Sequence, residues 1–132
     1  MNSILKQFIK HLTVGENEVV LLDMEAGVEH FGRGVDNSVD LILMIVDPSF
    51  ESLKLTKKIQ QLGESIGKTV FFVLNKVNEL VLPTMLESID DQSKVLAVIS
   101  TDTEIARKGL HGDELMMEIS EIHTLAKKIL KK

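Results

Sequence analysis

The sequence contains no cysteine, no tryptophan and no tyrosine. Without cysteine, the chain can form neither a disulfide framework nor a site in which its thiolates hold a metal. The five phenylalanines are the only aromatic residues, which leaves little material for stacking on nucleic-acid bases. These absences exclude disulfide frameworks and thiolate metal centres, and they argue against a base-stacking module.

Long apolar runs are also missing, and none approaches the roughly 20 residues that a bilayer-spanning helix needs. The first residues, Met1–Phe8, include Lys6 and lack the continuous apolar segment of a signal peptide. The formal net charge of −5 does not favour a nucleic-acid or anionic membrane surface as a partner. We therefore expect a cytoplasmic protein that binds neither nucleic acid nor membranes.

The length of 132 residues fits one domain with its own core, over residues 1–132. Four short runs rich in Val, Ile and Leu are apolar throughout, which predicts strands buried on both faces, as in a parallel sheet covered by helices. These runs are Val19–Leu22, Leu41–Val46, Val70–Leu74 and Val95–Ile99.

Three longer stretches show the apolar spacing of helices, namely Ile4–Leu12, Leu55–Ile66 and Leu115–Ile129. Ser49 is expected to cap the second helix and Gly67 to end it. The third is expected over about 113–131, because acidic residues open it and lysines close it. A shorter helix is expected to start near Thr103, because Thr101 and Glu104 have the spacing of a capping box. The whole order predicts an α/β fold with a mostly parallel sheet of about four strands flanked by helices.

Polar residues follow each predicted strand, where open parallel sheets bind ligands. They either point into a shared crevice or simply mark the chain returning to the surface. They are Asp23, Asp47, Asn75-Lys76 and Ser100-Thr101-Asp102.

The segment 19–34 has the layout of a Walker B strand followed by a switch loop. Asp23 ends an apolar run, as a group that orients Mg²⁺ would, and Gly27 follows four residues later. A glycine there lets its N–H approach a γ-phosphate without a side chain in the way. A tight surface turn that needs positive φ is the alternative interpretation.

The segment 70–78 ends in Asn75-Lys76-Val77-Asn78, which resembles the N-K-x-D base-recognition element of P-loop nucleotidases. Guanine specificity needs a carboxylate at the fourth position, so Asn78 argues against it, while an adenine contact by Asn75 stays open. Gly67-Lys68-Thr69 looks like the end of a phosphate-binding loop, but it closes a predicted helix and opens a predicted strand. We interpret Gly67 as a helix C-cap.

The run from Leu22 to Gly34, with Val46-Asp47-Pro48-Ser49, Asn75-Lys76 and Asp102 after it, resembles the nickel-insertion accessory ATPases of carbon monoxide dehydrogenase. These are P-loop ATPases of the SIMIBI class, of the Min/Par deviant-Walker type. The resemblance covers roughly residues 2–115.

The resemblance implies that Asp23 orients Mg²⁺, that Gly27 senses the γ-phosphate and that Asn75 contacts adenine. Lys76 and the loop Ser100-Thr101-Asp102 would complete the base site. It implies ATP and Mg²⁺ as cofactors of the complete protein, and carbon monoxide dehydrogenase or its complex as the partner. Apart from a Mg²⁺ held through Asp23, no metal site is expected in this chain.

The sequence departs from the family pattern in two places. It has no Walker A loop and no C-x-C metal motif. We therefore expect a partial domain, the C-terminal half of such a protein, that neither binds nor hydrolyses ATP alone. In the family the P-loop strand lies between the strands that end at Asp23 and Asp47. Its absence predicts direct pairing of those two strands, association with a second copy, or docking of a P-loop-bearing polypeptide.

Two other functions fit the residues. The first is a degenerate, non-catalytic relative that binds a partner through its switch-like loop. The second is an unrelated receiver-like or flavodoxin-like module, which Asp23 and Glu25 with Asp47 and Lys76 match only loosely.

Overall fold

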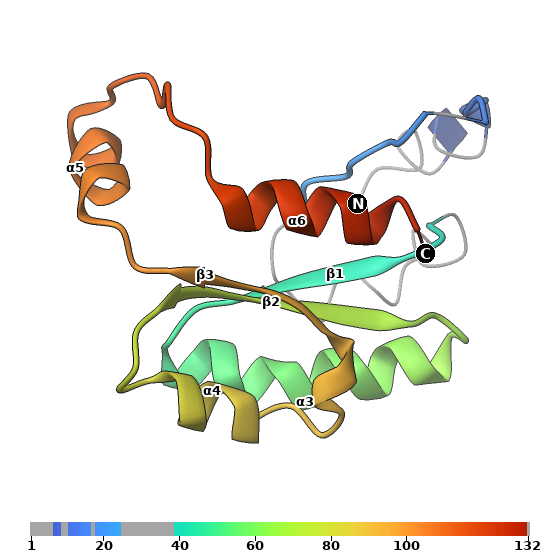
Figure 1. Cartoon of the computed structure of the whole chain (residues 1–132). Helices are drawn as coiled ribbons and strands as arrows, with labels where there is room; N and C mark the ends of the chain where they lie inside the picture. Colours follow the sequence, from blue (N-terminus) through green and yellow to red (C-terminus); the bar gives the residue numbers. More distant parts are fainter. Residues whose placement is uncertain (1–6, 9–10, 17, 25–38, 132) are drawn as a thin grey trace.

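A three-stranded parallel sheet forms the centre of the computed structural model (Figure 1). Its strands, β1 (Ile42–Val46), β2 (Val70–Val77) and β3 (Val95–Ser100), lie side by side in that order. The pairing of β1 with β2 continues without a shift along the whole of β1. The structure describes residues 7–8, 11–16, 18–24 and 39–131 of the chain.

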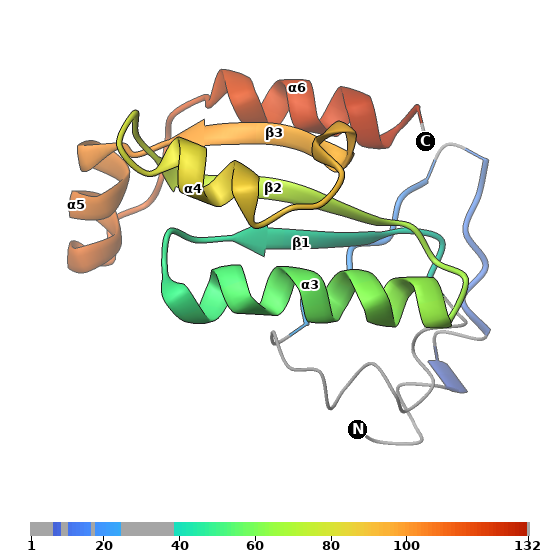
Figure 2. The same ribbon diagram turned by 90° about the horizontal axis from the view of Figure 1, so that it is seen from below.

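Helices cover both faces of the sheet (Figures 1 and 2). The helices α3 (Phe50–Ser65) and α4 (Leu82–Glu87) lie on one face, and α6 (Ser120–Ile129) lies on the other. The helix α5 (Thr103–His111) extends beyond the carboxyl end of β3, and the short 3₁₀ helix η3 (Gln92–Lys94) leads into β3. This arrangement confirms the predicted α/β fold with a parallel sheet. Within the described ranges, no helix has both the length and the apolar character needed to cross a membrane.

The main apolar core lies between the sheet and the layer of α3 and α4. Phe72, Leu74 and Met85 are completely buried in it. A smaller cluster around Val73 and Leu125 joins the sheet to α6. Because each fully buried large apolar side chain contributes about 1.5–3 kcal/mol, the α3–α4 face is the more strongly stabilised one.

Hydrogen bonds define both ends of α3 as the sequence predicts. Ser49 Oγ accepts from the Ser52 N–H at 3.3 Å and caps the first turn. At the other end Gly67 adopts a φ of 68°, and the Lys68 N–H donates to the Gly63 carbonyl at 2.8 Å. This is the left-handed helix ending that glycine favours. The interpretation of Gly67 as a C-cap rather than part of a phosphate loop is therefore confirmed.

β1 alternates between buried and exposed side chains, although its continuous apolar run predicted burial on both faces. Ile42, Met44 and Val46 belong to the α3 core, whereas Ile45 is 52% exposed. The cause is the position of α6, which packs mainly against β3 and leaves the β1 side of that face open.

The strand predicted over Val19–Leu22 is not formed. These residues lie outside the sheet, and Leu21 is 82% exposed. A strand needs a neighbour to satisfy its N–H and C=O groups, and in the described part of the chain β1 pairs with β2 alone. The described sheet therefore has three strands rather than about four. Direct pairing of Val19–Leu22 with the strand ending at Asp47 is absent.

One predicted helix start is wrong. The helix expected over about 113–131 begins only at Ser120. The segment before it must reach back from α5 to the sheet (Figure 1), which an extended chain does at about 3.3 Å per residue and a helix at only about 1.5 Å. The shorter helix α5 starts at Thr103 as expected, but Asp102 rather than Thr101 caps it. Of the helix expected at Ile4–Leu12, residues 7, 8, 11 and 12 are described; the first three are helical and Leu12 is not.

Candidate functional site

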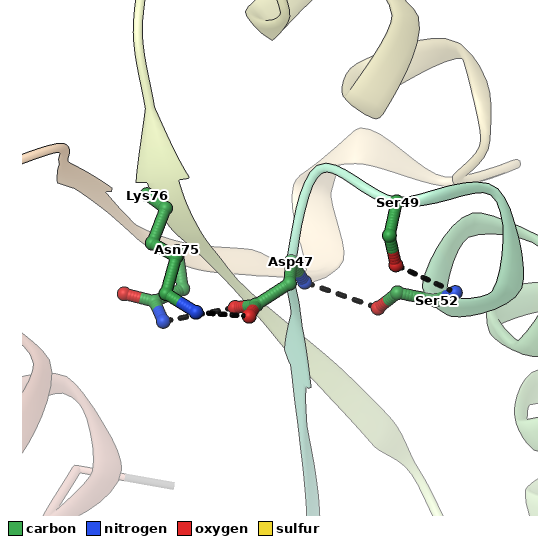
Figure 3. Close-up of polar contacts among 5 residues, drawn as sticks. All are labelled: Asp47, Ser49, Ser52, Asn75 and Lys76. Atoms are coloured by element: carbon green, nitrogen blue, oxygen red, sulfur yellow. Dashed lines mark hydrogen bonds and ion pairs between the residues drawn. The ribbon is translucent and has the colours of Figure 1, made fainter.

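Two side chains of β2 converge on the carboxylate of Asp47, the first residue after β1 (Figure 3). Asn75 Nδ2 donates to Oδ1 over 2.9 Å, and Lys76 Nζ lies 2.6 Å from Oδ2. Val46 and Leu74 are partners in the parallel ladder, so the residues after them emerge at the same edge of the sheet. The sequence predicts that all three polar residues lie at strand ends, but it does not predict that they contact one another.

The start of α3 holds Asp47 in place. Its backbone N–H donates to Ser52 Oγ at 3.0 Å (Figure 3). The side chains of Lys76 and Asp47 are 63% and 37% exposed, so their ion pair contributes only about 0–1 kcal/mol. The main consequence of the cluster is therefore the fixed orientation of the Asn75 amide.

Lys76 is the only non-glycine residue in the described ranges with a positive φ, at 54°. The pairing of β2 with β3 shifts at this point, between Leu74 and Val77. A left-handed backbone costs a residue with a Cβ roughly 1–2 kcal/mol, and such strain is concentrated at functional sites. The strand predicted from the sequence ends at Leu74. In the structure the irregular strand β2 continues to Val77 and includes Asn75 and Lys76.

The Asn75 amide keeps hydrogen-bonding capacity for a ligand. One N–H is directed to Asp47, and Figure 3 shows the carbonyl oxygen pointing away from that carboxylate. Among the described residues, the other N–H and the carbonyl oxygen of Asn75 have no hydrogen-bond partner. One donor beside one acceptor matches the N6 and N7 edge of adenine, which asparagine pairs with in two hydrogen bonds. The residues present therefore fit the base of ATP.

Asn78 has a structural role that the sequence analysis missed. Its Oδ1 accepts from the N–H groups of Leu80 at 3.0 Å and Val81 at 3.1 Å. It therefore forms the turn that leads into α4, as asparagine often does. The available signal was the residue type, because asparagine favours turns and Pro83 favours the first turn of a helix.

The loop after β3 is tied to the end of β2. The Thr101 N–H donates to the Val77 carbonyl at 2.9 Å. Asp102 Oδ1 accepts from the N–H groups of Glu104 and Ile105, at 2.7 and 3.0 Å, so it caps α5. Together with Ser100, these residues line one side of a shallow hollow of about 160 Å³ whose other side is residues 117–121. Ser100, Thr101 and Asp102 thus share a surface, and both Ser100, as the ladder partner of Val77, and the backbone of Thr101 meet β2.

Of the remaining predicted site residues, Asp23 does not join this cluster. Asp23 is exposed and lies in the segment 18–24, outside the sheet. Gly27 lies outside the described residues. Among the residues that the structure does describe, no three or more His, Cys, Asp or Glu side chains are grouped to hold a metal ion.

Comparison with known proteins yields relatives that bind ATP. An uncharacterized ATP-binding protein of Methanocaldococcus jannaschii is 47% identical over 122 residues, which are 92% of this chain and 49% of that protein. A second such protein from the same organism is 31% identical over 118 residues, 87% of this chain and 46% of its own length. No family model matches the chain.

The third relative has a named role. The carbon monoxide dehydrogenase accessory protein CooC of Rhodospirillum rubrum is 33% identical over 105 residues, 79% of this chain and 40% of CooC. The chain thus spans about half the length of the curated relatives it matches.

Proposed function

Because the chain belongs to the CooC-like family of P-loop ATPases, we propose that it forms the base-binding side of an ATP site. The observation that carries the proposal is the Asn75 amide, held by Asp47 with a donor and an acceptor left for adenine. Lys76 and the loop 100–102 flank the base in this proposal. The hydrogen bond from Thr101 to Val77 supports it, because it keeps that loop against the end of β2.

The phosphate side of the site is assigned by resemblance. Asp23 would orient Mg²⁺, and the Gly27 N–H would meet the γ-phosphate. The sequence contains no phosphate-binding loop, and this loop normally supplies most of the contacts to the phosphates. We therefore propose that this chain alone neither binds ATP tightly nor hydrolyses it.

Calorimetry with Mg-ATP and Mg-GTP tests this proposal. The titrations use the chain alone and the chain mixed with the part of the 47% identical M. jannaschii relative that it does not match. We expect micromolar binding only in the mixture, with ATP preferred to GTP. Asn75→Ala in the mixture should weaken ATP binding by about tenfold or more, since a good bidentate base contact is worth roughly 1–3 kcal/mol. Micromolar binding by the chain alone would contradict the half-site proposal.

CooC carries the name of a carbon monoxide dehydrogenase accessory protein, and we extend that role to this chain as a proposal. It would serve an ATP-dependent step of nickel insertion into that enzyme. Since the sequence contains no cysteine and therefore no C-x-C metal motif, we propose that its part in that step is nucleotide binding rather than holding the nickel. A strain without the gene should then accumulate carbon monoxide dehydrogenase with a low nickel content, which metal analysis measures. A normal nickel content would remove this role.

The contact between Asp47 and Lys76 is the one feature that a receiver-like module would share. Asp23, the acidic residue that such a site needs beside this pair, lies outside the sheet. The relatives are ATP-binding proteins, so the ATP site is the better supported function. A mixture that binds no nucleotide would instead favour a degenerate partner-binding module.

A further inference from the structure

A shallow apolar groove lies along one side of α6. It has a volume of about 460 Å³, and its lining includes Leu115, Ile119, Ile122 and Ala126. Leu115 and Ile122 remain 46% and 45% exposed, although Leu125 of the same helix is buried against the sheet. The helix α6 therefore has a second apolar side, which the described part of the chain leaves uncovered.

The two ends of this groove carry opposite charges. The charged residues of the segment 113–121 are all acidic, whereas those of the segment 127–131 are all lysines. Glu118 lines the groove at the acidic end. At the basic end, Lys127 lies one helical turn after His123, which also lines the groove. One surface thus combines an acidic end, an apolar centre and a basic end.

The two charges lie at matching distances from the centre of the groove. Measured along the chain, one extended and three helical steps separate Glu118 from Ile122, about 8 Å in all. Five helical steps separate Ile122 from Lys127, which is again about 8 Å. A twofold axis near Ile122 would therefore place Glu118 of each copy opposite Lys127 of the other. The same axis would direct Leu130, an exposed apolar residue at the end of α6, towards the Leu115 end of the other groove.

We infer that α6 and the segment before it form a binding site for a second copy of this chain, packed antiparallel across a twofold axis near Ile122. A twofold contact requires a surface that is complementary to itself, and opposite charges at the two ends of one apolar groove provide it. In a parallel arrangement like charges would face each other, which opposes association. This contact lies on α6 and not at the gap between strands where the sequence predicts association with a second copy. It does not depend on nucleotide binding.

Cross-linking through single cysteines tests the antiparallel arrangement, because the chain has no cysteine of its own. His123→Cys places a thiol beside the axis. Leu130 lies about 12 Å from Ile122 along α6, so the two copies of Leu130→Cys would be about 24 Å apart. With a short bifunctional maleimide, His123→Cys should form dimers at least about tenfold faster than Leu130→Cys, because proximity sets the rate. Faster cross-linking of Leu130→Cys would indicate parallel packing and overturn the inference.

Reversing the charges tests which residues meet. Glu118→Lys and Lys127→Glu each bring like charges together twice in the dimer. Each should raise the dissociation constant by about tenfold, since opposite pairs become repulsive ones of similar size. The double variant restores opposite charges and should return to within about threefold of the parent. Glu64→Lys is the control, because it changes the net charge equally but lies on α3, on the other face of the sheet.

Analytical ultracentrifugation measures these constants, and circular dichroism shows that each variant is folded. A parent chain that stays monomeric at about 1 mM, where even weak specific contacts are populated, would overturn the inference. A double variant that dimerises more weakly than either single variant would overturn it as well.

The occupant is tested by adding the part of the 47% identical M. jannaschii relative that this chain does not match. A dimer that persists in its presence would support a second copy as the occupant. Dissociation of the dimer, together with loss of cross-linking at His123→Cys, would assign the groove to the added polypeptide and overturn the inference.

Discussion

The side-chain amide of Asn75 donates to the Asp47 carboxylate across 2.9 Å and joins the ends of two neighbouring strands. A carboxylate only accepts hydrogen bonds, so this contact directs the amide nitrogen inward and the carbonyl outward. The pairing of asparagine with adenine depends on that orientation. Asp47 therefore acts on the proposed base contact through Asn75, as a positioning residue.

Asp47→Ala should lower the free energy of unfolding by about 1–2 kcal/mol, because it removes one hydrogen bond to a charged group and one half-exposed ion pair. Urea unfolding measures the loss. Asp113→Ala is the control, since Asp113 lies 3.8 Å from Arg107 in an exposed pair, and such pairs contribute little. Equal losses in the two variants would show that the Asp47 cluster is no more than a surface ion pair.

The left-handed backbone of Lys76 leads to a second prediction. Lys76→Gly relieves roughly 1–2 kcal/mol of backbone strain and loses an ion pair worth about 0–1 kcal/mol, so its stability should stay close to that of the parent or rise. Lys76→Val loses the same pair and keeps the strain, with a branched side chain that tolerates it poorly. Thermal unfolding should rank the glycine variant above the valine variant, and the reverse order would contradict the assigned backbone conformation.

Much of the fold could be predicted because it depends on local signals. The apolar runs before Asp47 and Asn75 identified two strands, and Ser49 and Gly67 identified the ends of the helix between them. The crossover from one strand to the next then makes the pair parallel, which brings Asp47 and Asn75 to one edge.

The rest depends on tertiary context. Val19–Leu22 has the composition of a strand, but a strand exists only with a neighbour, and the described part of the sheet provides none for it. Residues 113–119 contain helix-forming residues, but the distance from α5 to the sheet requires an extended chain. Lys76, which contacts Asp47, has a left-handed backbone, for which the sequence carries no signal.

Close packing of α3 on β2 predicts opposite effects for two glycine substitutions. A Cβ on Gly63 would clash with Val70 Cγ2 and lie 2.9 Å from the Lys68 carbonyl oxygen, whereas one on Gly109 would meet nothing within 4 Å. Gly63→Ala should therefore cost about 1–3 kcal/mol. Gly109→Ala, in the exposed helix α5, should add about 0.5–1 kcal/mol. Chemical unfolding measures both, and a neutral Gly63→Ala would contradict the close contact of α3 with β2.

The carboxylate of Asp91 gives a prediction about pH. Hydrogen bonds from the side chain and the backbone of Ser93 lower the pKa of Asp91 below its usual value. A lowered pKa in the folded state means that the stabilisation is present above the usual Asp range and is lost as pH falls through the folded pKa. Ser93→Ala removes the side-chain donor and should raise the pKa of Asp91, which an NMR titration of this carboxyl measures. An unchanged midpoint would show that the Ser93 hydroxyl does not hold it.

Asn78, the residue just after β2, should contribute to the stability of the fold. Asn78 Oδ1 accepts from the backbone of Leu80 and Val81, so Asn78→Ala should cost about 1 kcal/mol of stability, as the loss of other caps does. Asn78→Asp keeps an acceptor at the same place and should unfold like the parent.

Asn78→Asp also restores the N-K-x-D pattern, so a role of this residue in base recognition would raise the affinity of the mixture for Mg-GTP. We expect no gain, because the oxygen at this position is already engaged by two backbone N–H groups and the turn before α4 holds it there. Asn75→Ala should instead lower the affinity of the same mixture for Mg-ATP. Calorimetry that measures the affinity for both nucleotides decides which asparagine contacts the base. A gain of GTP binding by Asn78→Asp would assign the base contact to Asn78 rather than to Asn75.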